Sequence, residues 1–282
     1  MSEVYQARAD ADRALLLART ESPFTITVRF LGGLTQRQMD AFATAADRWV
    51  RVIVGDLPDV ELDGEVIDDV LIVARGEEID GEGQVLGQAR ITHVRPRGAE
   101  PSALLPVRGE MTFDKKDLAR METSGTLGDV ITHEMGHVLG LSGGLWAAKG
   151  LLVGADTDDP TFSGPAAMAE YHKLRGGSGD PVRVPVENTG GPGTRGTHWR
   201  DEVFGNELMT GFVNRPPNPL SRVTAAGLGD LGYQVDVDAA DDYDLPSADA
   251  LLAVVAQERV PCHSLVAMRD DPVEVSRESV KA

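Results

Sequence analysis

The chain has 282 residues, 41% of them hydrophobic, which fits one large domain or two small ones. Its 27 basic and 45 acidic side chains give a net charge of −18, which argues against binding to the backbone of a nucleic acid. The single cysteine, Cys262, excludes an intramolecular disulfide and says little about the redox compartment.

The first residues, 1–23, are interpreted as a polar, helix-prone lead-in rather than a targeting segment. Their apolar core, ALLLA, is shorter than the roughly 7–15 apolar residues of a secretory signal. No window approaches the roughly 20 apolar residues of a membrane span. We therefore expect no membrane span, a cytoplasmic location by default or export by a non-standard route, and a monomer by default.

Residues 24–142 are expected to form a first subdomain of strands and helices. Residues 24–31 alternate like a strand, and residues 34–55 have helical periodicity that begins at a capping box of Thr35 and Gln38. Three more strands are expected, at residues 70–74, 83–96 and 107–114.

The stretch DVITHEMGHVLGL, residues 129–141, predicts a buried helix that carries metal-binding chemistry. His133 and His137 are four residues apart, so their rings share one helix face and can reach one Zn²⁺ at about 2.0–2.1 Å. Glu134 is next to the first histidine, where it can touch a metal-bound water without ligating the metal. A chance match is the alternative, and the apolar setting of the helix disfavours it.

The ends of this helix are also marked in the sequence. Thr126 is the expected N-cap, with Asp129 able to reach back to it. Gly140 and the pair Gly143–Gly144 are expected to stop the helix. Beyond it we expect short helices at residues 165–174, within 221–235 and at 248–260, and a Gly- and Pro-rich surface insertion at 175–197.

A catalytic zinc takes three protein ligands and keeps one position open, so the pair of histidines is incomplete. The pattern H-E-x-x-H-x-x-G-x-x-H would place the third ligand at position 143, where this chain has glycine. Four histidines remain as candidates: His93, His172, His198 and His263.

A family resemblance rests on two stretches taken together, HEMGHVLG at 133–140 and HWRDEVFGNELMTG at 198–211. Separated by a long insertion, they resemble the leishmanolysin family of metzincin zinc endopeptidases, whose third histidine is displaced across an insertion and followed by a methionine turn. The resemblance covers roughly residues 24–245. It implies that His198 is the third zinc ligand, that Met209 is the Met-turn residue beneath the zinc, and that Gly140 is the turn glycine.

The resemblance also implies the architecture. We expect an α+β, metzincin-like zincin: a mixed twisted sheet with the active-site helix in residues 24–142. A mostly irregular C-terminal subdomain with the insertion, third histidine and Met-turn would occupy residues 143–246. Residues 247–282 would form a C-terminal tail.

The implied activity is that of a zinc metalloendopeptidase that hydrolyses internal bonds of a peptide or protein substrate, with Glu134 as general base. By analogy, the substrate would add to an edge strand upstream of the helix, for which we take VRGEMTF, and residues 210–213 would line the pocket beyond the cleaved bond. Two other classes stay open: a catalytically silent zincin-fold binding module, and a zinc hydrolase such as an aminopeptidase.

The chain departs from the parasite members of the family, which are rich in disulfides and made as secreted or surface-anchored precursors. Surface anchoring is therefore not carried over. Cys262 is interpreted as a plain, partly buried cysteine, although a thiolate is able in principle to cap a zinc. The acidic run DVDAADDYDLP, residues 236–246, is interpreted as solvated, with a weak Ca²⁺ site as the alternative.

Overall fold

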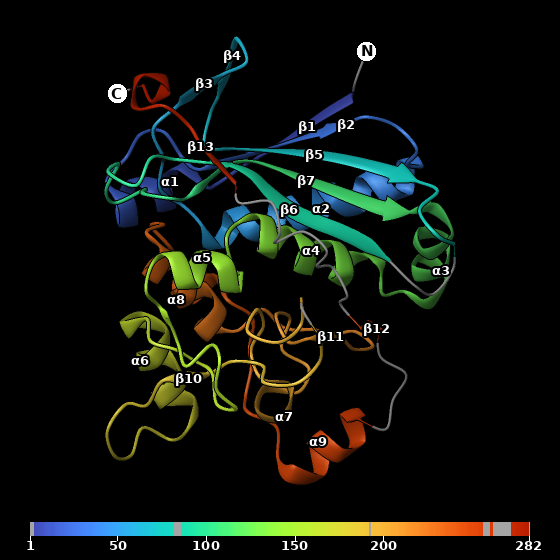
Figure 1. Ribbon diagram of the computed structural model, residues 1–282, viewed down its shortest axis with the longest axis vertical. Coiled ribbons are helices and arrows are strands. Elements are labelled where there is room, and N and C mark those ends of the chain that lie inside the picture. The colour runs from blue at the N-terminus through green and yellow to red at the C-terminus, as the bar shows by residue number, and fades with distance from the viewer. Residues whose placement is uncertain (1–2, 82–85, 192, 256–259, 262–271, 282) are drawn as a thin grey trace.

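A twisted sheet with two helices beneath it forms one half of the molecule, and short helices and loops form the other (Figure 1). The computed structural model describes residues 3–81, 86–191, 193–255, 260–261 and 272–281. Cys262 and His263 lie outside the described residues. None of the described helices is long and apolar enough to cross a membrane.

The strands are β1 (Glu3–Arg8), β2 (Thr25–Phe30), β3 (Val60–Leu62), β4 (Glu65–Ile67), β5 (Val70–Glu77), β6 (Gly87–Val94), β7 (Pro106–Asp114), β8 (Leu152–Val153), β9 (Thr161–Phe162), β10 (Val184–Pro185), β11 (Phe212–Val213), β12 (Val260–Pro261) and β13 (Val273–Glu274). The α-helices are α1 (Ala11–Arg13), α2 (Gln36–Val52), α3 (Lys115–Ser124), α4 (Leu127–Val138), α5 (Gly143–Ala148), α6 (Pro165–Leu174), α7 (Asp201–Phe204), α8 (Arg222–Leu231) and α9 (Ala248–Val255). Shorter helical turns are η1 (Ala14–Ala18), η2 (Val237–Ala239) and η4 (Arg277–Ser279).

The main sheet has the strand order β1-β2-β5-β7-β6-β13. β2, β5 and β7 run parallel to one another. β1 is antiparallel to β2 and β6 is antiparallel to β7, whereas β13 is parallel to β6. β5 begins with five buried residues, as expected of a strand that is covered on both faces. The α+β class and the mixed sheet that the sequence predicted are thereby confirmed.

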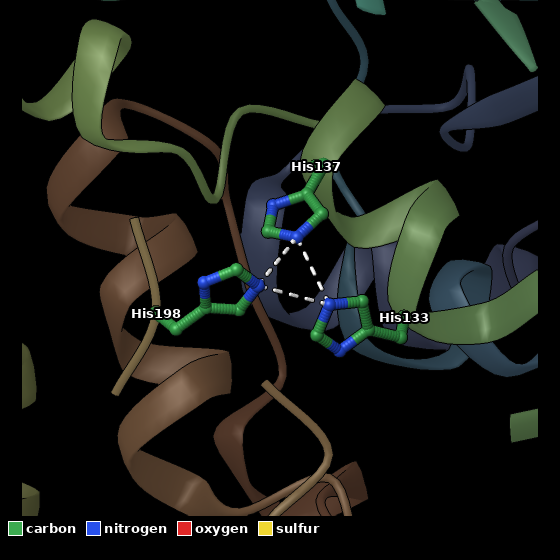
Figure 2. Close-up of side chains that lie close together, drawn as sticks. All are labelled: His133, His137 and His198. Carbon is green, nitrogen blue, oxygen red and sulfur yellow. Dashed lines mark hydrogen bonds between the residues drawn. The ribbon is translucent and has the colours of Figure 1, made fainter. Parts of the chain in front are cut away.

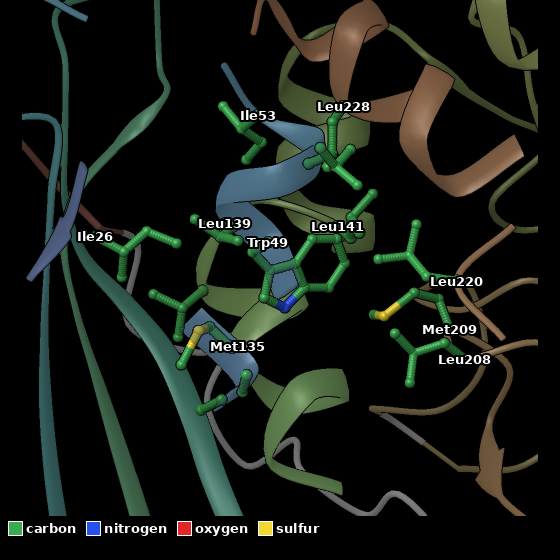
Figure 3. Close-up of a cluster of buried hydrophobic side chains, with 14 of the residues drawn as sticks. Ile26, Trp49, Ile53, Met135, Leu139, Leu141, Leu208, Met209, Leu220 and Leu228 are labelled. Atoms are coloured by element: carbon green, nitrogen blue, oxygen red, sulfur yellow. The ribbon is translucent and has the colours of Figure 1, made fainter. Parts of the chain in front are cut away.

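α2 and α4 pack together under the sheet and form the centre of the hydrophobic core (Figure 3). α2 begins at the predicted capping box, in which the Thr35 hydroxyl and the Gln38 amide each bond the other's backbone. Trp49 on α2 is fully buried and donates its indole N–H to the carbonyl of Thr132 on α4, at 2.9 Å. This hydrogen bond fixes the position of α4 relative to α2 under the sheet.

The N-terminal residues differ from the helical lead-in that was expected, because residues 3–8 form a strand at one end of the main sheet. β1 pairs with β2 along its whole length. The hydroxyl of Tyr5 donates to the carboxylate of Asp47 on α2, at 2.8 Å. Only residues 11–18 are helical. Two inward-facing side chains are too few to give a recognisable alternation of buried and exposed positions in the sequence. The segment is a strand because it pairs with β2.

The stretch VRGEMTF does not form an edge strand, so the substrate strand chosen from the sequence is wrong. β7 is hydrogen-bonded to β5 on one side and to β6 on the other. β6 is the strand nearer the edge. Among the described residues its outer side is paired only by β13, at His93 and Val94.

The second half contains α5 to α8 around a small sheet of the order β10-β9-β8. The helices predicted at 165–174 and within 221–235 are confirmed as α6 and α8. Gly143 and Gly144, predicted to stop a helix, instead open α5 behind the N-cap Ser142. The indoles of Trp146 and Trp199 stack with centroids 4.9 Å apart in the middle of this half.

The acidic segment 236–246 is solvated in part, as interpreted: Asp238, Asp242 and Asp244 are exposed, whereas Asp236 is buried. Three of its five aspartates pair with arginines from separate helices: Asp236 with Arg13, Asp238 with Arg222, and Asp241 with Arg48. Because these three carboxylates already have cationic partners, the arrangement gives no support to a Ca²⁺ site. The metal-ligand clusters found among the described residues do not include this segment.

Candidate metal centre

Three histidine side chains from two distant parts of the chain point at one another (Figure 2). Their Nε2 atoms lie 3.0 Å apart for His133 and His137, 3.2 Å for His133 and His198, and 3.1 Å for His137 and His198. All three side chains are buried. His93 and His172 belong to no metal-ligand cluster found among the described residues. The three histidines chosen from the sequence are therefore brought together.

Each of these rings has a hydrogen-bond acceptor at its other nitrogen, Nδ1. A carbonyl oxygen can only accept, so each Nδ1 donates and carries the proton, which leaves Nε2 with a free lone pair. The acceptors are the carbonyl of Leu208 for His133 (2.6 Å), that of Leu141 for His137 (2.6 Å), and that of Thr194 (3.0 Å) with the hydroxyl of Thr197 (2.8 Å) for His198.

A cation fits between the three Nε2 atoms. With no proton left on Nε2, the close contacts are not hydrogen bonds, and three lone pairs facing one another repel unless a positive ion sits between them. A tetrahedral zinc with Zn–N near 2.0–2.1 Å sets its nitrogens about 3.3 Å apart, close to the spacing found here. The donor set and its geometry therefore suit Zn²⁺.

Burial determines the charge state of these rings. It lowers the pKa of His133, His137 and His198 far below the usual value, and the neighbouring histidine in each case lowers it further. All three are therefore neutral at neutral pH. Metal ligation requires the neutral imidazole, so the site needs no deprotonation step to bind a metal.

α4 points His133 and His137 toward His198, which comes from the second half of the protein (Figure 2). The opposite surface, with Ile131, Met135 and Val138, is fully buried in the core beneath the sheet. Glu134 is itself only 3% exposed, one residue from His133. Glu134 therefore holds a carboxylate in the protein interior, on the helix that carries two of the three histidines.

The start of α4 differs from the predicted capping box. Thr126 is the N-cap, but its backbone is helical (φ −92°, ψ −8°) and its hydroxyl contacts Ser124 rather than a helix amide. α3 ends only two residues earlier, at Ser124. Asp129 instead accepts a hydrogen bond from Asn218 (2.7 Å) and lies 3.6 Å from Arg48. It therefore joins α4 to neighbouring segments.

Gly140 ends α4 as the sequence predicted. Its φ is +105°, a conformation that side-chain-bearing residues rarely adopt. The amide of Gly140 bonds the carbonyl of His137 and the amide of Leu141 bonds that of Gly136, which is a Schellman motif. The turn brings the carbonyl of Leu141 back to Nδ1 of His137. The glycine therefore also orients a histidine of the cluster.

The insertion, residues 138–197, returns to α4 just before His198. A Cβ added at Gly143 would lie 2.2 Å from the carbonyl oxygen of Gly196, so the returning chain passes directly against position 143. The carbonyl of His198 accepts from the amide of Glu187, at 2.9 Å. His198 thus reaches the cluster from a segment that packs where a local third histidine would have stood.

Met209 lies against α4 at Gly136, in the buried cluster that also contains Trp49 (Figure 3). A Cβ added at Gly136 would lie 2.8 Å from its Sδ and 2.8 Å from Trp49. The carbonyl of Met209 accepts from the amide of Trp199, the residue after His198, at 3.0 Å. Met209 is therefore packed on the helix and bonded to the segment that carries the third histidine.

Met209→Leu is expected to keep one zinc per chain and to lower the free energy of unfolding by at most about 1.5 kcal/mol, as volume-conserving swaps do. The reason is that the side chain packs against α4, with its sulfur next to Gly136, and is not one of the converging nitrogens. Elemental analysis and thermal unfolding of both proteins measure this. A large loss of zinc would show that Met209 does more than pack.

Several residues that shape the centre escaped the sequence analysis. The carbonyls of Leu208, Leu141 and Thr194 act through backbone atoms, which leave no trace in residue type. Glu207 is different, because it is a charged residue directly before the apolar pair Leu208 and Met209 and is fully buried. An acidic residue so close to the Met209 of the motif was the available signal.

Comparison with known proteins agrees with this centre. The family model described as Leishmanolysin matches residues 101–246, which is just over half of the chain and includes the three histidines, Glu134 and Met209. The chain belongs to the leishmanolysin family. The family expected from the two sequence stretches is confirmed.

Two relatives of this leishmanolysin-family chain cover shorter stretches. A "Leishmanolysin homolog" of Crithidia fasciculata is 29% identical over 109 residues, which is 36% of this chain and 16% of that protein. A "Leishmanolysin-like peptidase" of Caenorhabditis elegans is 46% identical over 58 residues, which is 20% of this chain and 9% of that protein. The aligned parts therefore span less than a fifth of either relative's length.

Proposed function

We propose that this chain is a zinc-dependent metalloendopeptidase, with His133, His137 and His198 as the zinc ligands. The observation that carries the proposal is the convergence of three unprotonated Nε2 atoms beside a buried glutamate on the same helix. Membership in the leishmanolysin family and the name of the Caenorhabditis elegans relative, a peptidase, support it.

The chemistry divides between the metal and the chain. When bound, zinc would polarise the scissile carbonyl and acidify a water molecule. Glu134 accepts a proton from the attacking water and gives it to the departing amine nitrogen, which balances the two proton transfers. The Nδ1 hydrogen bonds of the histidines hold each ring in the orientation and tautomer that ligation requires.

Met209 is assigned as the Met-turn residue, and residues 143–246 as the C-terminal subdomain. The packing of Met209 on Gly136 and its bond to Trp199 support the first assignment. β11 follows Met209 directly, and we assign Thr210 to Val213 to the wall of the pocket that receives the residue after the cleaved bond.

The substrate strand is reassigned from β7 to β6. β6 is antiparallel to β7, packs on α4, and among the described residues is paired on its outer side only at its last two residues. An extended peptide added there would run along the helix that carries the histidines and Glu134. Adding a peptide to the Glu134→Gln protein should slow amide hydrogen exchange in residues 87–92; protection confined to other strands would contradict this.

Cleavage of an unstructured protein such as casein, with and without a chelator, tests the activity. We expect one zinc per chain and internal fragments that disappear when zinc is removed and return when it is added back. Loss of single residues from the amino terminus would instead indicate an aminopeptidase. Bound zinc without any cleavage would leave the catalytically silent module.

A further inference from the structure

Glu207 is a fully buried carboxylate that is satisfied by neutral donors. Its Oε2 accepts from the amide of Met209 at 2.6 Å. Its Oε1 accepts from the amide (3.0 Å) and hydroxyl (2.8 Å) of Ser221 and from the hydroxyl of Thr224. Ser221 and Thr224 form the N-cap and first turn of α8, whose dipole favours a negative charge. Burial raises the pKa of Glu207, and these hydrogen bonds act against burial by stabilising the ionised carboxylate.

The amide of Met209 and the carbonyl of Leu208 belong to one peptide group. The N–H of this group donates to Glu207, and its carbonyl accepts from Nδ1 of His133 at 2.6 Å. The result is a continuous chain of hydrogen bonds from carboxylate to peptide group to imidazole. Because hydrogen bonds in series polarise one another, the carboxylate makes the Leu208 carbonyl a stronger acceptor and the Nε2 of His133 more basic.

The other two histidines lack this arrangement. The carbonyl that accepts from His137 belongs to the peptide group of Leu141 and Ser142, whose N–H donates to the carbonyl of Gly140. The carbonyl that accepts from His198 belongs to the group of Thr194 and Arg195, whose N–H donates to the carbonyl of Gly191. Of the three rings, His133 alone is linked to a carboxylate through its acceptor peptide.

A second link runs from Glu207 toward His198. The hydroxyl of Thr224, which donates to Glu207, accepts from the indole N–H of Trp199 at 2.8 Å. Trp199 is fully buried and directly follows His198. The same carboxylate is thus also linked, through the Thr224 hydroxyl, to the side chain that follows His198.

We infer that Glu207 is a positioning residue of the metal centre, which orients and polarises His133 through the Leu208–Met209 peptide group. The inference rests on the metal site proposed above and extends it by a residue that touches neither metal nor substrate. It assigns a functional reason to a buried charge that would otherwise be costly.

Glu207→Gln tests this with a nearly isosteric side chain that loses the charge. The glutamine side chain has one oxygen where the carboxylate has two, and it has no negative charge. The Leu208–Met209 peptide group is then no longer polarised by an anion. Competition with a fluorescent chelator should show zinc affinity weakened by about tenfold or more. The visible spectrum of the Co²⁺-substituted protein should shift, because the ligand field at His133 changes.

Asp114→Asn is the matched control. Asp114 is also a buried carboxylate that accepts backbone amides, those of Ile79 (2.8 Å) and Lys116 (2.8 Å). Burial raises its pKa, but these hydrogen bonds lower it below the usual value, and Asp114 belongs to neither metal-ligand cluster found among the described residues. Both variants are expected to lower the unfolding temperature of the metal-free protein. Only Glu207→Gln is expected to change zinc affinity and the Co²⁺ spectrum.

Zinc affinity of Glu207→Gln within about threefold of wild type, or an equal loss in Asp114→Asn, would overturn the inference. Should Glu207→Gln fail to fold, the inference is tested on the wild-type zinc protein by the NMR resonances of the histidine Nδ1 protons. The Nδ1 proton of His133 is expected to resonate furthest downfield of the three ligands. A His133 resonance upfield of that of His137 would contradict the polarisation of His133 by Glu207. Wild-type protein that binds zinc but cleaves no peptide would refute the proposed activity and leave this inference standing.

Discussion

Replacing Glu134 with glutamine is expected to abolish peptide-bond cleavage while one zinc per chain stays bound. The amide cannot accept a proton from water, and loss of a general base costs about 10²–10⁴-fold in rate. The three Nε2 atoms and their Nδ1 partners are untouched by the change, so the metal site is kept. Zinc stoichiometry and kcat/KM on an internally quenched peptide measure both halves of the prediction.

Glu202→Gln provides a control of the same chemistry. Glu202 is an exposed residue on α7, only four positions after His198, and is expected to be dispensable for both zinc and turnover. Cleavage retained by Glu134→Gln at near wild-type rate would remove Glu134 from the mechanism. Zinc lost in that variant would mean that the carboxylate supports the metal instead.

The residues of the motif helix could be predicted because their signals are local. His133, Glu134 and His137 need only helical spacing to share a surface, and the glycine at 140 needs only the sharp turn that a positive φ provides. The capping box at Thr35 and Gln38 is equally local. Each of these depends on residues within a few positions of one another.

The strand assignments show where that reasoning ends. The residue pattern of β7 fits an edge strand and an inner strand equally well. β7 becomes an inner strand because β6 folds back and pairs with it in antiparallel fashion. β1 has too few inward positions to be recognised, and its pairing with β2 makes it a strand. Strand order is a property of long-range pairing, which residue patterns do not carry.

His198 lies between these two cases. Its spacing from His137 is too large for any helical or turn rule, and only the stretch that follows it, through Met209, singled it out. The structure brings it to the cluster by packing Gly196 on Gly143. The supporting contacts of the site, such as the Leu208 carbonyl and Glu207, arise only once the fold has brought these segments together.

His198→Ala is expected to lose the zinc. Changes one shell out from a metal typically weaken binding by 10–100-fold, so removal of one of three ligands should cost more than about 100-fold. His172→Ala is the control, because His172 lies on α6 outside the histidine cluster. This variant should keep one zinc per chain. Zinc retained by the first variant and lost by the second would mean that the third ligand was assigned wrongly.

Adding a histidine at the local position should not rescue that loss. In the double variant that combines Gly143→His with His198→Ala, the Cβ at position 143 would lie 2.2 Å from the carbonyl oxygen of Gly196. Real Cβ atoms essentially never show so short a distance. The returning insertion would have to move away, and with it the backbone that leads to position 198. We therefore expect the double variant to bind no more zinc than His198→Ala. Restored zinc would show that the insertion yields easily and that a compact ligand set remains accessible to this fold.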